Sequence, residues 1–273
     1  MTSPETVIEV RGLRNQFGSQ VVHENLDLDI RRGEIVGVVG GSGSGKSVLL
    51  RSIIGLNRPA AGSVRLLGVE MTRVGARERA AVERRCGVLF QNGALFSSLT
   101  VAENTMVPMR EHYRLPQALM QRFAALKIAL AGLPENAGGK LPSQLSGGMV
   151  KRAALARAIA LDPDILFLDE PTAGLDPIGA AAFDQLILTL RESLGLTVFL
   201  ITHDLDTLYT ICDRVAVLSQ KRVLVADSLD KVERYDDPWV REYFQGPRGR
   251  SAELAARTAQ ARTHAAASNT GAP

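Results

Sequence analysis

The chain has few residues that could cross-link it or anchor it in a membrane. Its 273 residues include two cysteines, Cys86 and Cys212, and neither has a close Cys or His partner at metal-ligand spacing. Both are expected to be reduced thiols in the core of a cytosolic protein. No stretch approaches the roughly 18 uncharged apolar residues that a membrane-spanning helix needs. The N-terminus carries Glu5 and Glu9 and lacks the basic and then apolar layout of a secretory signal.

Net charge is absent from most of the chain. Residues 1–245 carry no net formal charge, and the excess of +3 comes from residues 246–273, which contain four arginines and one glutamate. A neutral body argues against nucleic-acid binding, so no nucleic-acid partner is expected. The tail, residues 247–273, is rich in Ala, Arg, Ser and Thr and is expected to be disordered or weakly helical. It either contacts an acidic partner or anionic lipid, or has no function.

The order of strand and helix patterns predicts an α/β fold with a mostly parallel sheet. Strands are expected at 6–10, 21–30, 34–39, 63–67, 87–90, 165–168, 197–201, 215–218 and 223–225, and helices at 46–56, 76–85 and 178–194. Residues 100–161 show no strand pattern, and their helical patterns are broken by Pro108, Pro116, Pro134 and Pro142. This region is therefore expected to form a helical subdomain.

A glycine-rich loop lies between an expected strand and an expected helix. Its sequence is Gly40-Gly41-Ser42-Gly43-Ser44-Gly45-Lys46-Ser47, which fits the phosphate-loop pattern G-x-x-x-x-G-K-[ST] in full. Glycines allow successive backbone N–H groups to point at phosphate oxygens. Lys46 can reach the β and γ phosphates, and the Ser47 hydroxyl can bind Mg²⁺. The alternative, a flexible Gly/Ser turn, does not account for the Lys-Ser pair or the flanking elements.

Two acids, Asp169 and Glu170, directly follow the apolar residues 165–168. Ligands bind at the C-terminal ends of strands in open parallel sheets. Asp169 is placed there to hold Mg²⁺, directly or through water, and Glu170 to polarise an attacking water. Alone, the pair could be the entry to a loop, but after a phosphate loop it predicts a hydrolytic site.

Two further polar residues are expected at the same edge of the sheet. Gln91 ends the strand expected at 87–90 and could bind Mg²⁺ or position water through its amide. His203 follows the strand at 197–201 and could bond the γ-phosphate as a neutral imidazole. Taken singly, Gln91 could be an ordinary surface residue, and His203 could be a histidine that serves only in packing. Their common place at strand ends favours a functional role.

A second anion site is expected in Leu145-Ser146-Gly147-Gly148-Met149-Val150-Lys151-Arg152, which opens a helix running to about residue 161. Ser146 is placed to cap the N-terminus of this helix. The glycines leave its backbone N–H groups bare for an anion.

These motifs, in this order, closely resemble those of the ABC ATPase family. The resemblance covers residues 5 to about 245 and includes the loop at 40–47, Gln91, the signature at 145–149, Asp169 and Glu170, residues 173–176 (Ala-Gly-Leu-Asp), and His203. It implies a P-loop NTPase fold with a mostly parallel sheet and an N-terminal antiparallel β subdomain. A helical signature subdomain at about 92–161 is inserted in one nucleotide-binding domain, residues 1–246.

The resemblance also implies the chemistry of the site. ATP is the expected substrate, and it binds together with Mg²⁺. The expected catalytic residues are Lys46, Gln91, Glu170 and His203. The expected metal ligands are Ser47, Gln91 and Asp169. Phe17 occupies the position where the family stacks an aromatic ring, usually Tyr, on adenine. Phe keeps the π face that such stacking requires.

The resemblance implies two nucleotide-binding domains that meet head to tail. Ser146, Gly147 and Gly148 of one domain would contact the γ-phosphate bound by the other, and Asp176 would lie at the seam. The chain has one phosphate loop and one signature. It must therefore pair with a similar ATPase, most simply a second copy of itself.

Met149 departs from the family pattern, where the signature usually ends in Gln. With this Met, residues 89–96, 110–112 and 146–160 look like the ATPases of Mla-type systems, which move phospholipids between membranes in Gram-negative bacteria. Related mycobacterial lipid and sterol importers look similar. The resemblance implies a lipid-binding periplasmic-facing subunit and a small cytosolic regulatory subunit as further partners.

Residues 93–99 are apolar and follow Gln91 directly. Such a loop could pack inward, whereas the family implies that residues 91–99, with the helical subdomain, receive a cytoplasmic helix of a membrane permease. The expected location is then the cytoplasmic face of the inner membrane. Two rivals remain: an ATPase of a drug exporter or small-solute importer, and a soluble ABC protein acting on DNA or ribosomes. The second rival would usually carry two nucleotide domains, a coiled coil or a zinc insertion.

Overall fold

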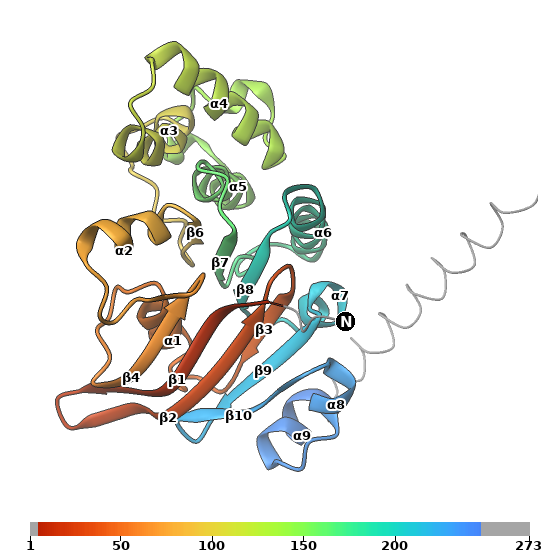
Figure 1. Cartoon of the computed structure of the whole chain (residues 1–273). Coiled ribbons are helices and arrows are strands. Elements are labelled where there is room, and N and C mark those ends of the chain that lie inside the picture. Colours follow the sequence, from red (N-terminus) through yellow and green to blue (C-terminus); the bar gives the residue numbers. More distant parts are fainter. Residues whose placement is uncertain (1–4, 247–273) are drawn as a thin grey trace, which may run out of the picture.

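The computed structural model describes residues 5–246 and confirms an α/β architecture built on two sheets (Figure 1). The basic tail, on which the sequence places a disordered or weakly helical segment, lies outside the described residues. A four-stranded antiparallel sheet has the order β2-β1-β4-β5. Its strands are β1 (Thr6–Phe17), β2 (Gln20–Arg31), β4 (Ala61–Leu66) and β5 (Val69–Glu70).

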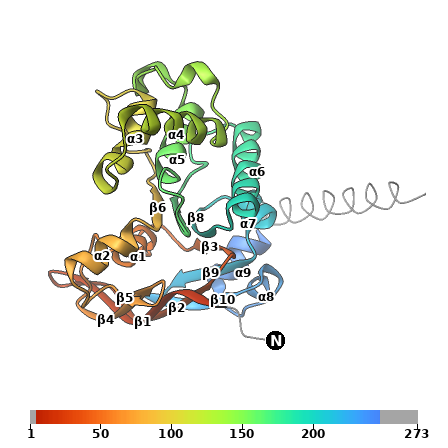
Figure 2. The ribbon, with the colours of Figure 1, turned by 45° about the horizontal axis from the view of Figure 1, so that its top comes forward.

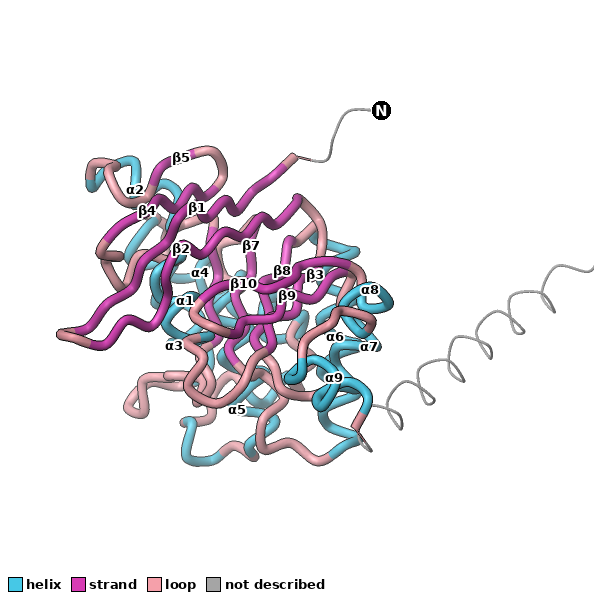
Figure 3. The backbone as a smooth tube through the Cα atoms, turned by 90° about the horizontal axis from the view of Figure 1, so that it is seen from below, coloured by secondary structure: helices cyan, strands magenta, loops and turns pink. Residues whose placement is uncertain are grey.

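The second sheet has six strands in the order β10-β9-β3-β8-β7-β6. Its strands are β3 (Ile35–Val39), β6 (Cys86–Leu89), β7 (Ile165–Asp169), β8 (Thr197–Ile201), β9 (Arg214–Ser219) and β10 (Arg222–Asp227). All neighbours pair in parallel except β9 and β10. Seen from below, β1 and β2 lie over the parallel strands (Figure 3). The mostly parallel sheet and the antiparallel subdomain are thus as predicted.

Nine α-helices occur within the described part of the chain, besides two short 3₁₀ helices (Glu135–Ala137 and Pro142–Gln144): α1 (Lys46–Ile53), α2 (Ala76–Glu83), α3 (Val101–His112), α4 (Gln117–Leu130), α5 (Gly147–Ala158), α6 (Pro177–Leu194), α7 (Leu205–Ile211), α8 (Leu229–Glu233) and α9 (Pro238–Gln245). Helices α3, α4 and α5 gather on the side away from the antiparallel sheet (Figure 2). They form the predicted helical subdomain, and α5 lies between the other two helices and the parallel strands (Figure 1).

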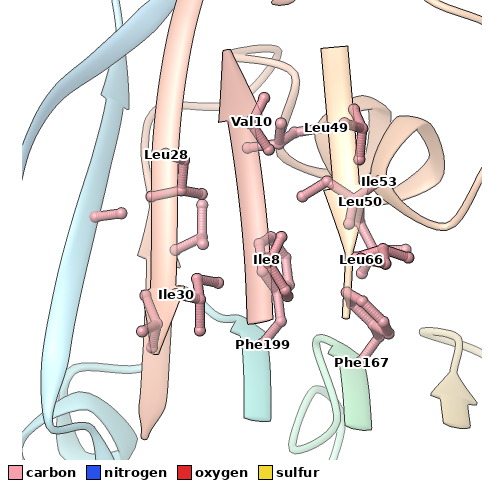
Figure 4. Packing of buried hydrophobic residues seen from close by; sticks show 14 of the residues in the cluster. Ile8, Val10, Leu28, Ile30, Leu49, Leu50, Ile53, Leu66, Phe167 and Phe199 are labelled. Atoms are coloured by element: carbon pink, nitrogen blue, oxygen red, sulfur yellow. The ribbon is translucent and has the colours of Figure 1, made fainter. Parts of the chain in front are cut away.

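The parallel strands are buried on both faces, which explains their nearly continuous apolar sequences. In β7, Ile165 and Phe167 pack toward the antiparallel sheet, whereas Leu166 and Leu168 pack toward α5 and α6. Ile8 of β1 and the buried face of α1 complete the first of these cores (Figure 4). The two cores fix the C-terminal edge of β3, β7 and β8, where the candidate site lies.

Pro108 corrects one expectation, because it lies inside α3 and does not end a helix. An internal proline removes one backbone hydrogen bond and costs about 3 kcal/mol. Met106 and Met109 are buried on either side of it, and a capping box formed by Thr100 and Glu103 fixes the first turn. Packing and capping outweigh the local cost.

Several boundaries also differ from the sequence-based expectation. β1 continues past the expected end at residue 10 as far as Phe17, α5 ends at Ala158 before the expected 161, and β6 ends at Leu89. The short strand β5 and the helices α7, α8 and α9 have no counterpart among the predicted elements. These elements are short, and short helices and strands carry little periodic signal.

Both cysteines are free thiols, and they are partly buried against the hydrophobic cores, not fully inside them as the sequence predicts. Burial raises the pKa of Cys86 to about 12 and raises the pKa of Cys212 as well, which disfavours the thiolate form of both side chains. Among residues 5–246, no helix is both long and apolar enough to cross a membrane.

Asp184 of α6 provides a test of the packing between α6 and α7. Its side chain is 4% exposed and accepts a hydrogen bond from the Thr207 hydroxyl at 2.8 Å. Burial raises the pKa of Asp184 from 3.8 to about 6. The folded chain therefore binds the proton more tightly than the unfolded chain, and stability falls as pH rises from 3.8 to about 6.

At about 1.4 kcal/mol per pH unit, ionised Asp184 lowers the free energy of unfolding by roughly 3 kcal/mol above pH 6. Asp184→Asn is expected to remove most of this loss and to flatten the decline between pH 4 and pH 6. Urea unfolding at pH 5 and pH 8 measures both effects. Equal stability of the two proteins at pH 8 would contradict the assignment.

Candidate functional site

The phosphate loop, residues 40–47, joins the C-terminal end of β3 to the first turn of α1, as predicted. Gly43 and Gly45 have φ angles of 77° and 97°, in the left-handed region that disfavours other residues. A Cβ atom at Gly40 would lie 2.3 Å from the carbonyl oxygen of Leu218, so no side chain fits there. The shape of the loop thus depends on glycine at these positions.

Lys46 begins α1 and turns back over the loop. Its ammonium donates to the carbonyl oxygens of Gly40 at 2.8 Å and Gly41 at 3.2 Å. No side chain caps α1 and no acid lies in its first turn, so its N–H groups and dipole are available to an anion. Burial lowers the pKa of Lys46, and the carboxylates of Glu170 and Asp169 oppose this shift. The start of α1 is therefore built to bind an anion.

A hollow of about 740 Å³ opens over the phosphate loop. It is lined by Phe17, Gln20, Val22, Gly40, Ser42, Gly43, Gly45, Lys46, Ser47, Val48, Glu170 and His203. The Phe17 side chain is 51% exposed at the end of β1, and Gln20 and Val22 come from the same face of β2. An aromatic and apolar wall beside an anion-binding loop matches the shape and chemistry of a nucleotide.

Ser47 and Asp169 lie together at the floor of the site. The Ser47 hydroxyl donates to Asp169 Oδ1 at 3.3 Å, and the Asp169 side chain is 6% exposed. Burial raises the pKa of Asp169, and within residues 5–246 no cation forms an ion pair with it. A hydroxyl and a buried carboxylate without a cation are oxygen donors that Mg²⁺ prefers. The residues present therefore fit the predicted metal.

Glu170 and His203 form a contact that differs from the expected one. His203 Nδ1 lies 2.9 Å from Glu170 Oε2, and both residues line the hollow. The sequence predicts His203 as a partner of the γ-phosphate, but here it contacts the acid. A neutral ring that donates Nδ1–H to the carboxylate has only a lone pair at Nε2, so a bond from Nε2 to a phosphate oxygen requires a proton on both ring nitrogens.

The backbone of Glu170 is strained, with φ of 49°. Such a conformation costs a non-glycine residue about 1–3 kcal/mol and is common at active sites. The N–H of Glu170 donates to the carbonyl of Ile201 at 2.9 Å. The acid is therefore fixed by its backbone as well as by His203.

Gln91 corrects a second expectation. It lies two residues beyond the end of β6, in a turn, and so does not end the strand. Its side chain is exposed and does not line the hollow. Its backbone carbonyl accepts a hydrogen bond from the Lys151 ammonium. The structure thus brings Gln91 to α5 and does not place its amide over the phosphate loop.

The signature residues lie away from the chain's own phosphate loop. Ser146 caps α5 as predicted, accepting a hydrogen bond from the Met149 N–H at 3.3 Å. Neither Ser146 nor Gly147 and Gly148 line the hollow. A Cβ atom at Gly148 would lie 3.6 Å from Leu175, so the signature adjoins the segment before α6.

Asp176 has a local role that the sequence-based interpretation missed. Its carboxylate accepts a hydrogen bond from the Gly179 N–H at 2.9 Å and caps α6. Asp176 does not line the hollow of its own chain either.

The sequence-based interpretation also missed a polar group behind the phosphate loop. Asn15, His23 and Ser52 are almost fully buried. Asn15 Nδ2 lies 2.9 Å from His23 Nδ1, and its Oδ1 accepts from Ser52 at 3.0 Å. Burial lowers the pKa of His23 to about 4, so the ring is neutral at pH 7. A Cβ atom at Gly45 would lie 2.4 Å from His23 Nε2, so the ring supports the loop from behind.

The comparisons with known proteins agree with this geometry. The profile of the family described as ABC transporter matches residues 23–173. The chain belongs to this family. It is an ABC ATPase.

Two groups of relatives span most of this ABC ATPase. The intermembrane phospholipid transport system ATP-binding protein MlaF of Haemophilus influenzae is 37% identical over 242 residues, which are 89% of this chain and 91% of the relative. The probable ribonucleotide transport ATP-binding protein mkl of Mycobacterium leprae is 39% identical over 244 residues, 88% of this chain and 69% of the relative.

A solved structure supports the fold and the reaction. The ATP-binding cassette MJ0796, a dimer in a post-hydrolysis state with ADP and Pi, has a TM-score of 0.75 and 30% identity. The match covers 81% of this chain and 98% of that chain. An ABC ATPase fold and ATP hydrolysis are thereby established for this chain.

Proposed function

We propose that this ABC ATPase is the ATP-hydrolysing subunit of a membrane transporter and works as a homodimer on MgATP. One observation carries the proposal. The hollow over the phosphate loop is lined by the groups that bind and hydrolyse a nucleotide, yet none of the signature residues reaches it. One chain therefore contains only half of the nucleotide site, and a second copy supplies the signature residues of the other half.

Within one chain, the hollow orients the nucleotide. The Phe17 ring would stack on the base, worth about 1 kcal/mol, and Lys46 would exchange its bonds to Gly40 and Gly41 for phosphate oxygens. Ser47 and Asp169 would hold Mg²⁺, whereas Gln91, the third ligand expected from the sequence, does not line the hollow. The ion would supply charge neutralisation on the phosphates. Within residues 5–246 no group of three His, Cys, Asp or Glu residues suited to a metal occurs, and the oxygen donors present at the site are the Ser47 hydroxyl and the Asp169 carboxylate.

Glu170 is the general base of the proposed site. Its carboxylate lines the hollow and would accept a proton from the attacking water, while His203 orients the carboxylate through the contact of 2.9 Å. The strained backbone of Glu170 fixes the acid before the nucleotide arrives.

The second copy would present the N-terminal end of α5. Ser146 and Gly147 are exposed there, and the first turn of α5 carries no acidic side chain. Its free N–H groups would bind the γ-phosphate in trans. Asp176, through the helix that it caps, would place the adjoining segment at the seam between the copies.

Residues 91–99 are the proposed docking site of the permease. The alternative of a loop that packs inward fits Leu95 but not Phe96, whose side chain is 53% exposed. The Asn104 side chain accepts from the Phe96 N–H at 2.8 Å and so fixes the backbone beneath this exposed ring. An exposed aromatic side chain on a fixed backbone is typical of an interface anchor.

Phospholipid is the proposed substrate class, because MlaF is named as a phospholipid transport protein and matches this chain over nearly the whole of both chains. The name of mkl, a probable ribonucleotide transport protein, makes a different solute the alternative. The proposed location is the cytoplasmic face of the inner membrane, through the permease. A periplasmic-facing lipid-binding subunit and a small cytosolic subunit would complete the complex.

The proposal is tested by extracting the chain from its own membranes in mild detergent and identifying the bound proteins and lipids by mass spectrometry. A permease with enriched phospholipid is the expected result. Phe96→Asp is expected to reduce recovery of the permease at least tenfold, with unchanged ATP affinity, because a charge replaces the apolar anchor. Tyr235→Asp is the matched control, since this ring, between α8 and α9, is 38% exposed and lies outside both the docking segment and the helical subdomain. Full recovery of the permease with Phe96→Asp, or recovery of ribosomes or DNA, would contradict the proposal.

A further inference from the structure

A buried lysine connects three parts of the ABC ATPase that are distant in sequence. Lys151 lies in the second turn of α5 and is 7% exposed. Its ammonium donates to the backbone carbonyl of Glu170 at 3.1 Å and to that of Gln91, which is 60 residues away. One side chain thus joins the signature helix, the docking segment and the catalytic acid.

The burial of this charge is unusual and is offset by a specific environment. Burial lowers the pKa of Lys151, and the carboxylates of Glu170 and Asp169 oppose the shift. Within residues 5–246 the ammonium forms no ion pair, and it donates hydrogen bonds to the two carbonyl oxygens. An apolar residue would fill the same space without the cost of burying a charge. What Lys151 provides that an apolar residue cannot is the pair of hydrogen bonds to the Gln91 and Glu170 carbonyls.

A second cation of α5 reinforces the link to the docking segment. The Arg157 guanidinium donates to the carbonyl oxygens of Gly93 at 2.8 Å and Ala94 at 2.7 Å. Both of these residues have positive φ. Residues 91–94 are therefore attached to α5, and of the two cations it is Lys151 that also reaches Glu170.

The hydrogen bond from Lys151 to the Glu170 carbonyl links α5 to the residue proposed as general base. The residue has φ of 49°, and its N–H is held by Ile201 while its carboxylate contacts His203. The Lys151 bond to the carbonyl restrains the peptide group on the other side of the same residue. Loss of this bond lets the backbone relax and moves the carboxylate away from the position of the attacking water.

We infer that Lys151 is a positioning residue that aligns Glu170 for hydrolysis and ties that alignment to the position of α5 and residues 91–94. The inference rests on the proposed role of Glu170 as general base. Lys151 does not line the nucleotide hollow. It therefore affects turnover and leaves ATP affinity unchanged.

The test uses Lys151→Met, which keeps the length of the side chain and removes its donors, and Lys151→Gln, whose shorter amide cannot reach both carbonyls. ATPase kcat and KM are measured on the full chain, together with ATP affinity and melting temperature. Both variants are expected to lose about tenfold or more in kcat, because small misplacements of catalytic groups have effects of this size. KM for ATP is expected to stay within twofold.

Lys127→Met is the matched control, since Lys127 of α4 is also a buried lysine, 4% exposed, and its ammonium pairs with Asp162, outside the signature segment and the nucleotide hollow. It is expected to retain kcat. A folded Lys151 variant with kcat within twofold of the original protein, or with a raised KM and unchanged kcat, overturns the inference. Glu170→Gln is assayed in parallel. If it is inactive while the Lys151 variants are active, only this inference fails, whereas an active Glu170→Gln overturns the proposed mechanism as well.

Discussion

Glu170→Gln is expected to lower ATPase kcat at least about 100-fold while leaving ATP bound. The change removes the proton acceptor, and general-base catalysis contributes about 10²–10⁴ in rate. The amide keeps the shape of the side chain and can still contact His203, so the hollow and the phosphate loop stay intact. ATP should therefore hold two copies together, and size-exclusion chromatography in MgATP is expected to show a lasting dimer.

Glu192→Gln is the control, because it makes the same chemical change at an exposed position of α6. It should hydrolyse ATP normally and should not accumulate the dimer. Retention of more than a tenth of the activity by Glu170→Gln would show that another group accepts the proton.

Lys46→Ala is expected to weaken ATP binding at least about 100-fold. The ammonium would otherwise donate charged hydrogen bonds to phosphate, worth about 1.5–3 kcal/mol each. The mutation also removes the ammonium that bonds the carbonyls of Gly40 and Gly41, so the empty loop loses its own restraint. Equilibrium binding of a fluorescent ATP analogue measures the loss.

The control for Lys46 is Lys231→Ala, which removes the same charge from α8, where the lysine is exposed and pairs with Asp227. Its ATP affinity is expected to stay unchanged. Affinity within threefold of the original protein for Lys46→Ala would contradict the placement of phosphate at the start of α1.

The sequence predicts the main strands of the fold because their pattern depends on local properties. The run at 165–168 is apolar at every position since β7 is buried on both faces. Pro108 was misjudged because its local cost is outweighed by tertiary packing around Met106 and Met109. The helices α7 and α8 were missed because seven and five residues are too few to show a period.

In the candidate site, too, residues whose roles depend on local sequence were predicted, and residues whose roles depend on distant contacts were not. The residues of the phosphate loop were predicted because their roles depend on neighbouring backbone, and Phe17 because of a family resemblance. His23 could not be found, since an isolated histidine in a strand gives no sign that it will support Gly45. Lys151 belongs to the signature segment, but its role could not be predicted from the sequence. Its hydrogen-bond partners are 60 and 19 residues away, and their positions depend on how α5 packs on β6 and β7.

Helix α5 also sets how the two nucleotides of a dimer would influence each other. Gly147 begins the helix, and Lys151 follows one turn later, about 6 Å along the axis. In the proposed dimer the first turn touches the neighbour's γ-phosphate while the second turn restrains the chain's own Glu170. ATP bound to one copy would then affect Glu170 of the other copy through one rigid turn of α5. Hydrolysis is expected to show positive cooperativity in ATP, with a Hill coefficient between one and two.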